Sequence, residues 1–351
     1  FKEDRPLWFI RAGLFFYDLL SGDGGLPSAK KMNAQEIASL SPYLNQSALH
    51  HNMQGAFLYY DALMLDDVIV RIAAHAAKKL GGTFAEDTDV TAVTPLPGGG
   101  FKVLLQGSSG EQQTVTTRYI VNATGAWCNW NLLRWQFIPS ITCLLNVGSH
   151  IVFQKDVVKQ QQSNLAATLI QEKDGRVVFF LPWNNHWLLG TTESILSGEP
   201  AGMRSPESDK KYLMDTAHEF FNLESPEKKI SEIFSGVRCM PLTKKTNFTH
   251  INSSWYEDPY HSPFYVNQLD KNISSLSRET VLDETLPGLI NIYGGKYTTY
   301  RSISQKITTY LARQLKAGGQ SLTHMQDSWY LSELMQERPE IFQSSEFLRT
   351  L

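Results

Sequence analysis

The chain has 351 residues, of which 42% are hydrophobic and 19% are charged, an ordinary composition for a globular protein of about two domains. The formal net charge of −3 excludes the broad basic surface that nucleic-acid binding requires, so we expect no nucleic-acid partner. Cys128, Cys143 and Cys239 are odd in number and far apart, so we expect reduced thiols and neither a disulfide framework nor a zinc site.

The first predicted element is an apolar stretch from Pro6 to Leu20, interrupted by Arg11 and Asp18. It is shorter than the roughly 20 residues that a membrane-spanning helix needs. Two alternatives stay open: a helix of the protein core, which we favour without further context, or a helix lying in a membrane interface.

The next segments predict a helix followed by a small sheet. The periodicity from Asp66 to Leu80 is helical, with Asp66 as the N-cap and Gly81-Gly82 as the stop. Alternating residues separated by glycine turns then predict a three-stranded meander, with strands at 88–94, 101–105 and 113–117.

The middle of the chain combines a buried strand with further β-structure. The strand at 118–122 ends in Ala123, Thr124 and Gly125. A second group of strands and a helix follow, with a turn at Asn184-Asn185 between the last two strands; their ranges are 150–153, 177–182, 187–190 and, for the helix, 210–221. From about residue 314 the chain is a polar helical tail.

The most distinctive turn begins at Gly294-Gly295-Lys296. An apolar strand, Leu289 to Tyr293, enters it, and a helix with Ile303, Ile307, Leu311 and Leu315 on one face leaves it, capped by Thr298 or Thr299 and ended by Gly318-Gly319. The glycines permit close approach of a ligand to the backbone, and the helix start and Lys296 supply positive charge. The site suits an anion or a ring that gains negative charge. The alternative is an ordinary turn with a solvated lysine.

Three basic residues and one histidine are candidates for chemistry. Arg238 follows the small pair Ser235-Gly236, and together with Arg278 and Lys296 it would hold a dianion. His150 would serve as a base near neutral pH. Each residue alone fits an ordinary surface ion pair or hydrogen bond, and the spacing does not prove that they converge.

Ten short motifs, in order along the chain, resemble FAD-dependent glycerol-3-phosphate dehydrogenase. The likeness covers roughly residues 5–315. The motifs run from Arg5 to Trp8, Arg11 to Phe15, Tyr17 to Asp18, Asp66 to Asp67, Val121 to Gly125, Gly148 to Val152, Arg176 to Trp183, Gly190 to Glu193, Ser235 to Arg238, and Gly294 to Arg301.

The resemblance implies an α/β plus α+β architecture. A partial glycine-oxidase-like FAD-binding domain with an inserted β-meander would take residues 60–137 and 277–318. A cap domain with a large mixed β-sheet would take residues 1–59 and 138–276. Residues 319–351 would form a helical tail.

The resemblance also implies oxidation of sn-glycerol 3-phosphate to dihydroxyacetone phosphate, with hydride transfer to FAD and electron transfer to quinone. His150, Arg238 and Lys296 would be catalytic, and Arg238, Arg278 and Lys296 would bind substrate. The FAD-binding residues would be Ala123, Thr124, Gly125, Gly294, Gly295, Lys296, Tyr297 and Thr298. The location would be peripheral on the inner (cytoplasmic) membrane, with the cytoplasm as the alternative, and a homodimer is allowed.

The chain departs from that family at its FAD fingerprint. The strand with a Gly-x-Gly-x-x-Gly turn that binds the FAD pyrophosphate is absent from this sequence. We therefore expect an incomplete portion of the enzyme, inactive and weak in FAD binding on its own. Two alternatives stay open: a non-catalytic remnant or binding module, and a related flavin oxidase of small hydroxy or amino acids.

Overall fold

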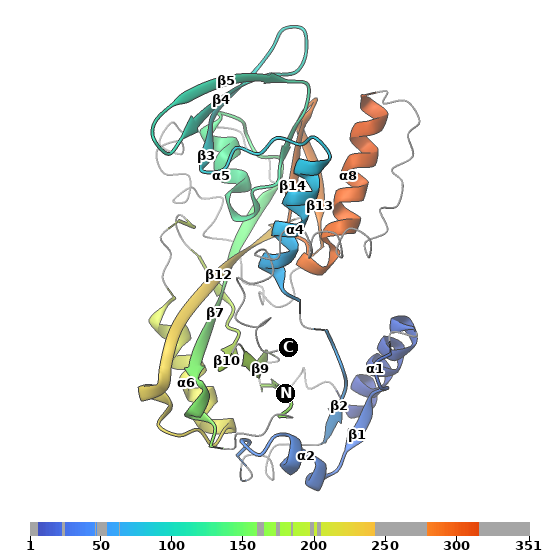
Figure 1. Ribbon diagram of the computed structural model, residues 1–351, viewed down its shortest axis with the longest axis vertical. Helices are drawn as coiled ribbons and strands as arrows, with labels where there is room; N and C mark the ends of the chain where they lie inside the picture. The colour runs from blue at the N-terminus through green and yellow to red at the C-terminus, as the bar shows by residue number, and fades with distance from the viewer. Residues whose placement is uncertain are drawn as a thin grey trace. The chain divides into compact units, whose positions relative to one another are not determined.

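The computed structural model describes residues 6–22, 25–45, 47, 55–62, 64–159, 165–172, 176–183, 185–196, 200–201, 205–242 and 279–315 (Figure 1). The chain forms two compact units. Unit 1 comprises Phe1–Met64, Val147–Ser194 and Gly202–Gly236; unit 2 comprises Leu65–Asn146, Ile195–Ala201 and Val237–Leu351. The domain boundaries at 59, 137, 276 and 318 stay predictions.

Unit 1 contains most of a six-stranded sheet with the strand order β11-β7-β10-β9-β8, in which β12 pairs with β7; residues 142–146, 195 and 237–242 of these strands are counted with unit 2. The strands are β7 (Thr142–Gln154), β8 (Thr168–Gln171), β9 (Val177–Trp183), β10 (His186–Gly190), β11 (Ser194–Ile195) and β12 (Ile230–Leu242). The ladders β8–β9, β9–β10 and β10–β7 are antiparallel, and Gly190 lies opposite both Phe179 and His150. The strands predicted at 150–153, 177–182 and 187–190 are confirmed. The predicted turn between the last two strands includes Asn184, which lies outside the described residues.

The core of unit 1 follows from the alternation of apolar side chains along these strands. Phe180 and Trp187 stack with their ring centroids 4.7 Å apart, and Phe221 packs on Phe180 at the same distance. Helix α6 (Glu207–Phe220) adds Leu213 and Ala217, both fully buried. The helix predicted at 210–221 is therefore confirmed. The smaller elements of unit 1 are β1 (Lys30–Met32), α2 (Ala34–Leu40), β2 (Ala56–Leu58), η2 (Lys155–Val157) and η3 (Pro226–Lys229).

The apolar N-terminal stretch forms helix α1 (Leu7–Ser21), but it is not a core helix. None of its residues is buried, and Trp8 and Phe15 are 70% and 64% exposed. The side that includes Leu7, Ile10 and Leu14 is half-buried, whereas a second apolar side faces solvent. The favoured interpretation of this stretch as a core helix is therefore wrong. Apolar side chains lie on more than one side of the helix, and the neighbouring residues of unit 1 cover only one of these sides.

Unit 2 contains two three-stranded sheets (Figure 1). The meander has the order β3-β4-β5, and the other sheet has the order β13-β14-β6. The bounds are β3 (Thr88–Pro95), β4 (Phe101–Gly107), β5 (Gln112–Thr117), β6 (Ile120–Asn122), β13 (Val281–Leu286) and β14 (Leu289–Tyr293). The predicted meander is confirmed, and the strand at 289–293 is buried as expected.

The helices of unit 2 are α4 (Asp66–Lys79), η1 (Gly125–Trp127), α5 (Cys128–Arg134), η5 (Tyr297–Thr299) and α8 (Tyr300–Gln314). Helix α4 begins as predicted, but Leu65 is its N-cap and Asp66 its first helical residue. Thr299 is the N-cap of α8, yet its hydroxyl bonds the Lys296 carbonyl and does not cap the helix. Gly318-Gly319 and the tail at 319–351 lie outside the described residues.

Candidate functional site

The two strands that end in the predicted cofactor residues run parallel in unit 2. Strands β6 and β14 pair with Ile120 opposite Leu289 and Asn122 opposite Asn291. Their carboxyl ends therefore meet at one edge of the sheet, the edge at which open α/β sheets bind ligands. Ala123, Thr124 and Gly125 leave β6 there, and residues 294–298 leave β14 there. The structure thus brings together eight predicted cofactor-binding residues.

The two glycines after β14 are required by the backbone geometry. Gly294 and Gly295 have φ values of 65° and 95°, in the region that side-chain-bearing residues rarely adopt. A Cβ on Gly294 would lie 2.8 Å from the Glu279 carbonyl oxygen and 2.9 Å from Pro241 Cδ. The turn is therefore packed directly against its neighbours in unit 2. Residues 295–298 are nevertheless exposed on their outer side.

Gly125 also has a positive φ, but no atom packs against the position that its Cβ would take. Its φ is 57°, and a Cβ placed on it would meet no atom within 4 Å. Ala123 and Thr124 are exposed as well. Backbone at the end of β6 is therefore accessible to a flat or extended ligand.

Buried asparagines hold this edge in place. Asn122 donates from Nδ2 to Asn291 Oδ1 at 3.0 Å and to the Cys128 carbonyl at 3.1 Å. Asn291 in turn donates to Thr285 Oγ1 at 2.8 Å, and Thr124 donates to Asn122 Oδ1 at 2.7 Å. Because Asn122 and Asn291 are almost fully buried, these bonds offset the cost of removing the amides from water. Neither asparagine was singled out in the sequence, although both stand on strands recognised there.

Tyr297 anchors the turn to another helix of unit 2. Its hydroxyl donates to the Asp66 carbonyl at 2.8 Å, and its ring stacks on Tyr300 with centroids 5.7 Å apart. Partial burial, followed by the nearby carboxylate of Asp66, raises the pKa of the Tyr297 phenol. Lys296 and Thr298 are exposed beside it, at the start of η5 and α8. The first N–H groups of that helical segment remain free of intrahelical partners, as at any helix start.

His150 belongs to unit 1, where it stands on β7 opposite Gly190. Its imidazole stacks on Phe234, with centroids 4.9 Å apart and an interplanar angle of 16°, and lies 5.7 Å from the Phe179 ring. A Cβ on residue 190 would overlap this imidazole, so glycine there makes room for it. Gly190 and Phe234 were not recognised from the sequence as neighbours of His150, because they meet it only through strand pairing and the fold.

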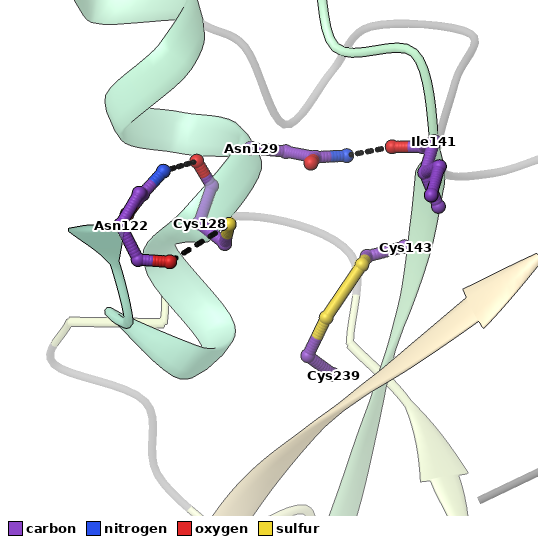
Figure 2. Close-up of a disulfide and its surroundings, with 6 residues drawn as sticks. All are labelled: Asn122, Cys128, Asn129, Ile141, Cys143 and Cys239. Carbon is purple, nitrogen blue, oxygen red and sulfur yellow. Dashed lines mark hydrogen bonds between the residues drawn. A yellow bond between two sulfur atoms is a disulfide. The ribbon is translucent and has the colours of Figure 1, made fainter. Parts of the chain in front are cut away.

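Arg238 lies on β12 in unit 2 and is exposed. The next residue, Cys239, forms a disulfide with Cys143 of β7, with the two Cα atoms 5.7 Å apart (Figure 2). The expectation of reduced thiols without a disulfide is therefore wrong for this pair. The cysteines are 96 residues apart in the chain, and the pairing of β7 with β12 brings them together.

The third cysteine packs in the same cluster as the disulfide. Cys128, Cys143 and Tyr293 are all buried, with Cys239 against them. Burial raises the pKa of the Cys128 thiol to about 12. Its sulfur contacts the Asn122 carbonyl, while the adjacent Asn129 donates to the Ile141 carbonyl at 3.0 Å (Figure 2). Cys128 is therefore a packing residue and not a nucleophile.

A cavity of about 360 Å³ lies beside Thr124 in unit 2. Its other lining residues are Asp89, Trp127, Trp130, Asn131 and Arg134. Arg134 donates to both carboxylate oxygens of Asp89 at 2.8 Å, and these bonds hold the pKa of that carboxyl below its usual value. The cavity combines two indole rings with the Arg134–Asp89 ion pair. It was not predicted from the sequence, because Asp89 comes from β3 whereas the other lining residues lie at 124–134, about 40 residues later.

The predicted catalytic and substrate-binding residues are divided between the two units. Arg278 lies outside the described residues. His150 is in unit 1, whereas Arg238 and Lys296 are in unit 2. Their roles stay predictions. Within the described ranges, no group of three or more His, Cys, Asp and Glu side chains is placed to hold a metal ion. No helix in those ranges is both long enough and apolar enough to cross a membrane.

Residues 7–268 match the family model described as FAD dependent oxidoreductase. D-erythritol 1-phosphate dehydrogenase of Brucella abortus is 28% identical over 312 residues, which are 87% of this chain and 54% of that protein. Aerobic glycerol-3-phosphate dehydrogenase of Escherichia coli is 27% identical over 316 residues, again 87% of this chain and 55% of that protein. The chain thus spans about half the length of the curated relatives it matches.

Two solved structures share the fold. Glycerol-3-phosphate dehydrogenase from Bacillus halodurans, complexed with FAD, matches 82% of this chain and 49% of its own with a TM-score of 0.62 and 19% identity. Glycine oxidase from Bacillus cereus matches 90% of this chain and 72% of its own with a TM-score of 0.53 and 14% identity. The predicted fold class, with a glycine-oxidase-like FAD-binding architecture, is confirmed.

Proposed function

This chain belongs to the family of FAD dependent oxidoreductases, and we propose on that basis a specific reaction. The protein would oxidise sn-glycerol 3-phosphate to dihydroxyacetone phosphate and pass the electrons to a quinone. The family and its cofactor, FAD, were both predicted from the motifs. The substrate rests on the relatives, several of which are glycerol-3-phosphate dehydrogenases at 27–28% identity.

One structural observation carries the proposal for this chain. The parallel strands β6 and β14 deliver two exposed glycine-containing turns to the same sheet edge. Gly125 has no atom within 4 Å of its Cβ position and residues 295–298 are exposed, so backbone groups of both turns are accessible to a ligand. These residues fit the flavin cofactor of the family, because a flat ring requires close approach to backbone.

When bound, FAD supplies a two-electron acceptor for the hydride removed from the substrate. The residues after β14 would hold that ring by their backbone. The helical start at Tyr297 to Tyr300 offers free N–H groups and a positive dipole end, which stabilise negative charge close to them. Lys296 adds a full positive charge at the same turn.

We assign the substrate roles from the charge and hydrogen-bonding chemistry of the residue types. Arg238 and Arg278 would hold the phosphate through paired, charge-assisted hydrogen bonds, and Lys296 would orient the substrate. His150 would accept the proton of the hydroxyl at C2. Its imidazole is fixed by Phe234 and by the space at Gly190, which suits a base that must keep one orientation.

A second substrate of the same chemical class is supported by a specific observation. The D-erythritol 1-phosphate dehydrogenase is 28% identical, as similar as the glycerol-3-phosphate enzymes. Both substrates are polyol phosphates, and the same arginines would bind either phosphate. The two candidates differ by one CHOH unit, so residues away from the phosphate would distinguish them.

We place the protein at the inner-membrane surface, with the cytoplasm as the alternative, because a quinone acceptor is dissolved in lipid. Helix α1 supports this proposal with its exposed aromatic side chains, among them Trp8, Phe9, Phe15 and Phe16. Aromatic rings of this kind favour the membrane interface, and Arg11 on the same helix is exposed to meet anionic head groups.

The substrate is tested by reduction of a soluble dye acceptor by the full-length protein. We expect turnover with sn-glycerol 3-phosphate and none with unphosphorylated glycerol, because the arginines recognise the phosphate. D-erythritol 1-phosphate at the same concentration distinguishes the two candidates. Equal turnover of glycerol, or turnover of neither phosphate, would contradict the proposal.

A further inference from the structure

A buried carboxylate in unit 1 gathers hydroxyl groups from several segments of the chain. Asp209 is only 4% exposed, and it stands in the first turn of α6. Burial of an ionised carboxylate is costly unless its oxygens are hydrogen-bonded. Three hydroxyls donate to it at 2.6 Å: Ser149 and Thr192 to Oδ2, and Ser194 to Oδ1.

The hydroxyl network has a single direction of donation. Ser149 Oγ gives its proton to Asp209, so its 2.7 Å contact with Ser235 Oγ must be a bond donated by Ser235. Ser235 is then the acceptor in its 2.6 Å contact with Ser205 Oγ, for the same reason. One negative charge thereby orients a chain of hydroxyls that reaches β12.

This network joins the two segments that frame His150. Ser149 precedes His150 on β7, and adjacent side chains of a strand point to opposite faces, so Ser149 and His150 face opposite sides. Thr192 follows two residues after Gly190, the residue paired with His150. The Ser149 N–H also donates to Thr192 Oγ1 at 2.9 Å, which ties the two segments directly.

We propose that Asp209 is a positioning residue for His150. It acts through Ser149 and Thr192, which hold β7 and the end of β10 in the relative position that lets the imidazole fit over Gly190 and stack on Phe234. The inference rests on the proposed function in one respect, the assignment of His150 as the proton acceptor. The geometric part, control of the imidazole by Asp209, does not depend on that assignment.

Two substitutions at this position separate shape from hydrogen bonding. In Asp209→Asn, the amide oxygen still accepts from Ser149 and Thr192, and the amide nitrogen donates to Ser194 Oγ, which is able to accept. In Asp209→Ala, the hydroxyls of Ser149 and Thr192 lose their common acceptor. Leu213→Ala is the matched control, because it also truncates a fully buried side chain of α6 but removes no hydrogen-bonding group from the network.

The experiment uses the full-length flavoprotein with ¹³C-labelled histidine, in which His150→Gln identifies the His150 signal. Stacking on Phe234 shifts this signal by the ring current. We expect Asp209→Ala to move the signal towards that of an exposed histidine. It should also lower kcat about a hundredfold, because misplacement of a reacting group by about 1 Å has an effect of that order. Asp209→Asn should restore kcat to within about fivefold of the parent value. Leu213→Ala should lower the melting temperature and leave the signal in place.

An unchanged His150 signal in Asp209→Ala, or an equal change in Leu213→Ala, overturns the proposal. If Asp209→Ala does not fold, Ser149→Ala replaces it: the signal should move in the same direction by a smaller amount, and an unmoved signal overturns the proposal. A signal that moves as expected in a protein that does not oxidise sn-glycerol 3-phosphate would refute the proposed function and leave the positioning role established.

Discussion

Replacement of Gly294 by alanine tests whether the turn after β14 is built as described. At this residue the added methyl group meets two separate penalties. A φ of 65° costs a non-glycine residue about 1–2 kcal/mol. The Cβ would also lie 2.8 Å from the Glu279 carbonyl oxygen, and overpacking of this kind costs about 1–3 kcal/mol. We therefore expect Gly294→Ala to lower the free energy of unfolding by about 2–5 kcal/mol.

Two other glycines of unit 2 separate the two penalties. Gly125 has a φ of 57° but no atom within 4 Å of its Cβ position, so Gly125→Ala should cost only the backbone strain, about 1–2 kcal/mol. Gly98 has neither a positive φ nor a close neighbour, so Gly98→Ala should change stability by less than about 0.5 kcal/mol.

Urea denaturation of the four proteins, followed by tryptophan fluorescence, gives these differences directly. The flavin content of each full-length variant is measured in parallel, and only the two positive-φ positions should lower it. A Gly294→Ala protein as stable as Gly98→Ala would show that the turn is not strained or packed as described. Equal losses of free energy in Gly125→Ala and Gly294→Ala would show that the contact with Glu279 has no energetic effect.

Three further predictions concern the substrate, the membrane and the cysteines. In the full-length enzyme, Arg238→Ala should lower kcat/KM by an amount equivalent to about 2–4 kcal/mol of transition-state stabilisation. Arg238→Lys should restore little of this loss, because lysine cannot form the paired hydrogen bonds to phosphate. Near-normal kinetics for the alanine variant would show that Arg238 is not part of the site. Trp8→Ser combined with Phe15→Ser should release the enzyme into the soluble fraction while it still reduces a soluble acceptor, and a variant that unfolds or stays membrane-bound would show that α1 is not the contact. Peptide mapping without reductant should find Cys143 linked to Cys239. Cys128 should resist alkylation at about pH 8, because a thiol pKa of about 12 leaves roughly one thiol in ten thousand ionised at that pH. Rapid alkylation of Cys128 in the folded protein would contradict its burial.

Much of the secondary structure was predictable because its signals are local. The alternation and glycine turns of the meander, and the apolar run from Leu289 to Tyr293, depend only on residues close in sequence. The glycine pair at 294–295 is likewise a local signal for a turn between this strand and the helix that follows, and in the structure both residues have positive φ.

The contacts that support the sites were not predictable from local patterns. Gly190 makes room for His150 across a strand pair, and Asp209 reaches Ser149 from a helix 60 residues further along the chain. Cys143 and Cys239 became partners only through the pairing of β7 with β12. Helix α1 was misjudged for a related reason: its sequence shows how apolar it is but not how much of its surface the neighbouring chain covers.

The central claim, that this flavoprotein takes a hydride from C2 of sn-glycerol 3-phosphate, is tested most directly by anaerobic stopped-flow spectroscopy of the full-length protein. We expect the flavin absorbance to disappear on mixing with sn-glycerol 3-phosphate. Deuterium at C2 should slow this change severalfold, because the C2–H bond is broken in that step. Absorbance that persists with the substrate, or that disappears at the same rate with the deuterated substrate, would contradict the claim.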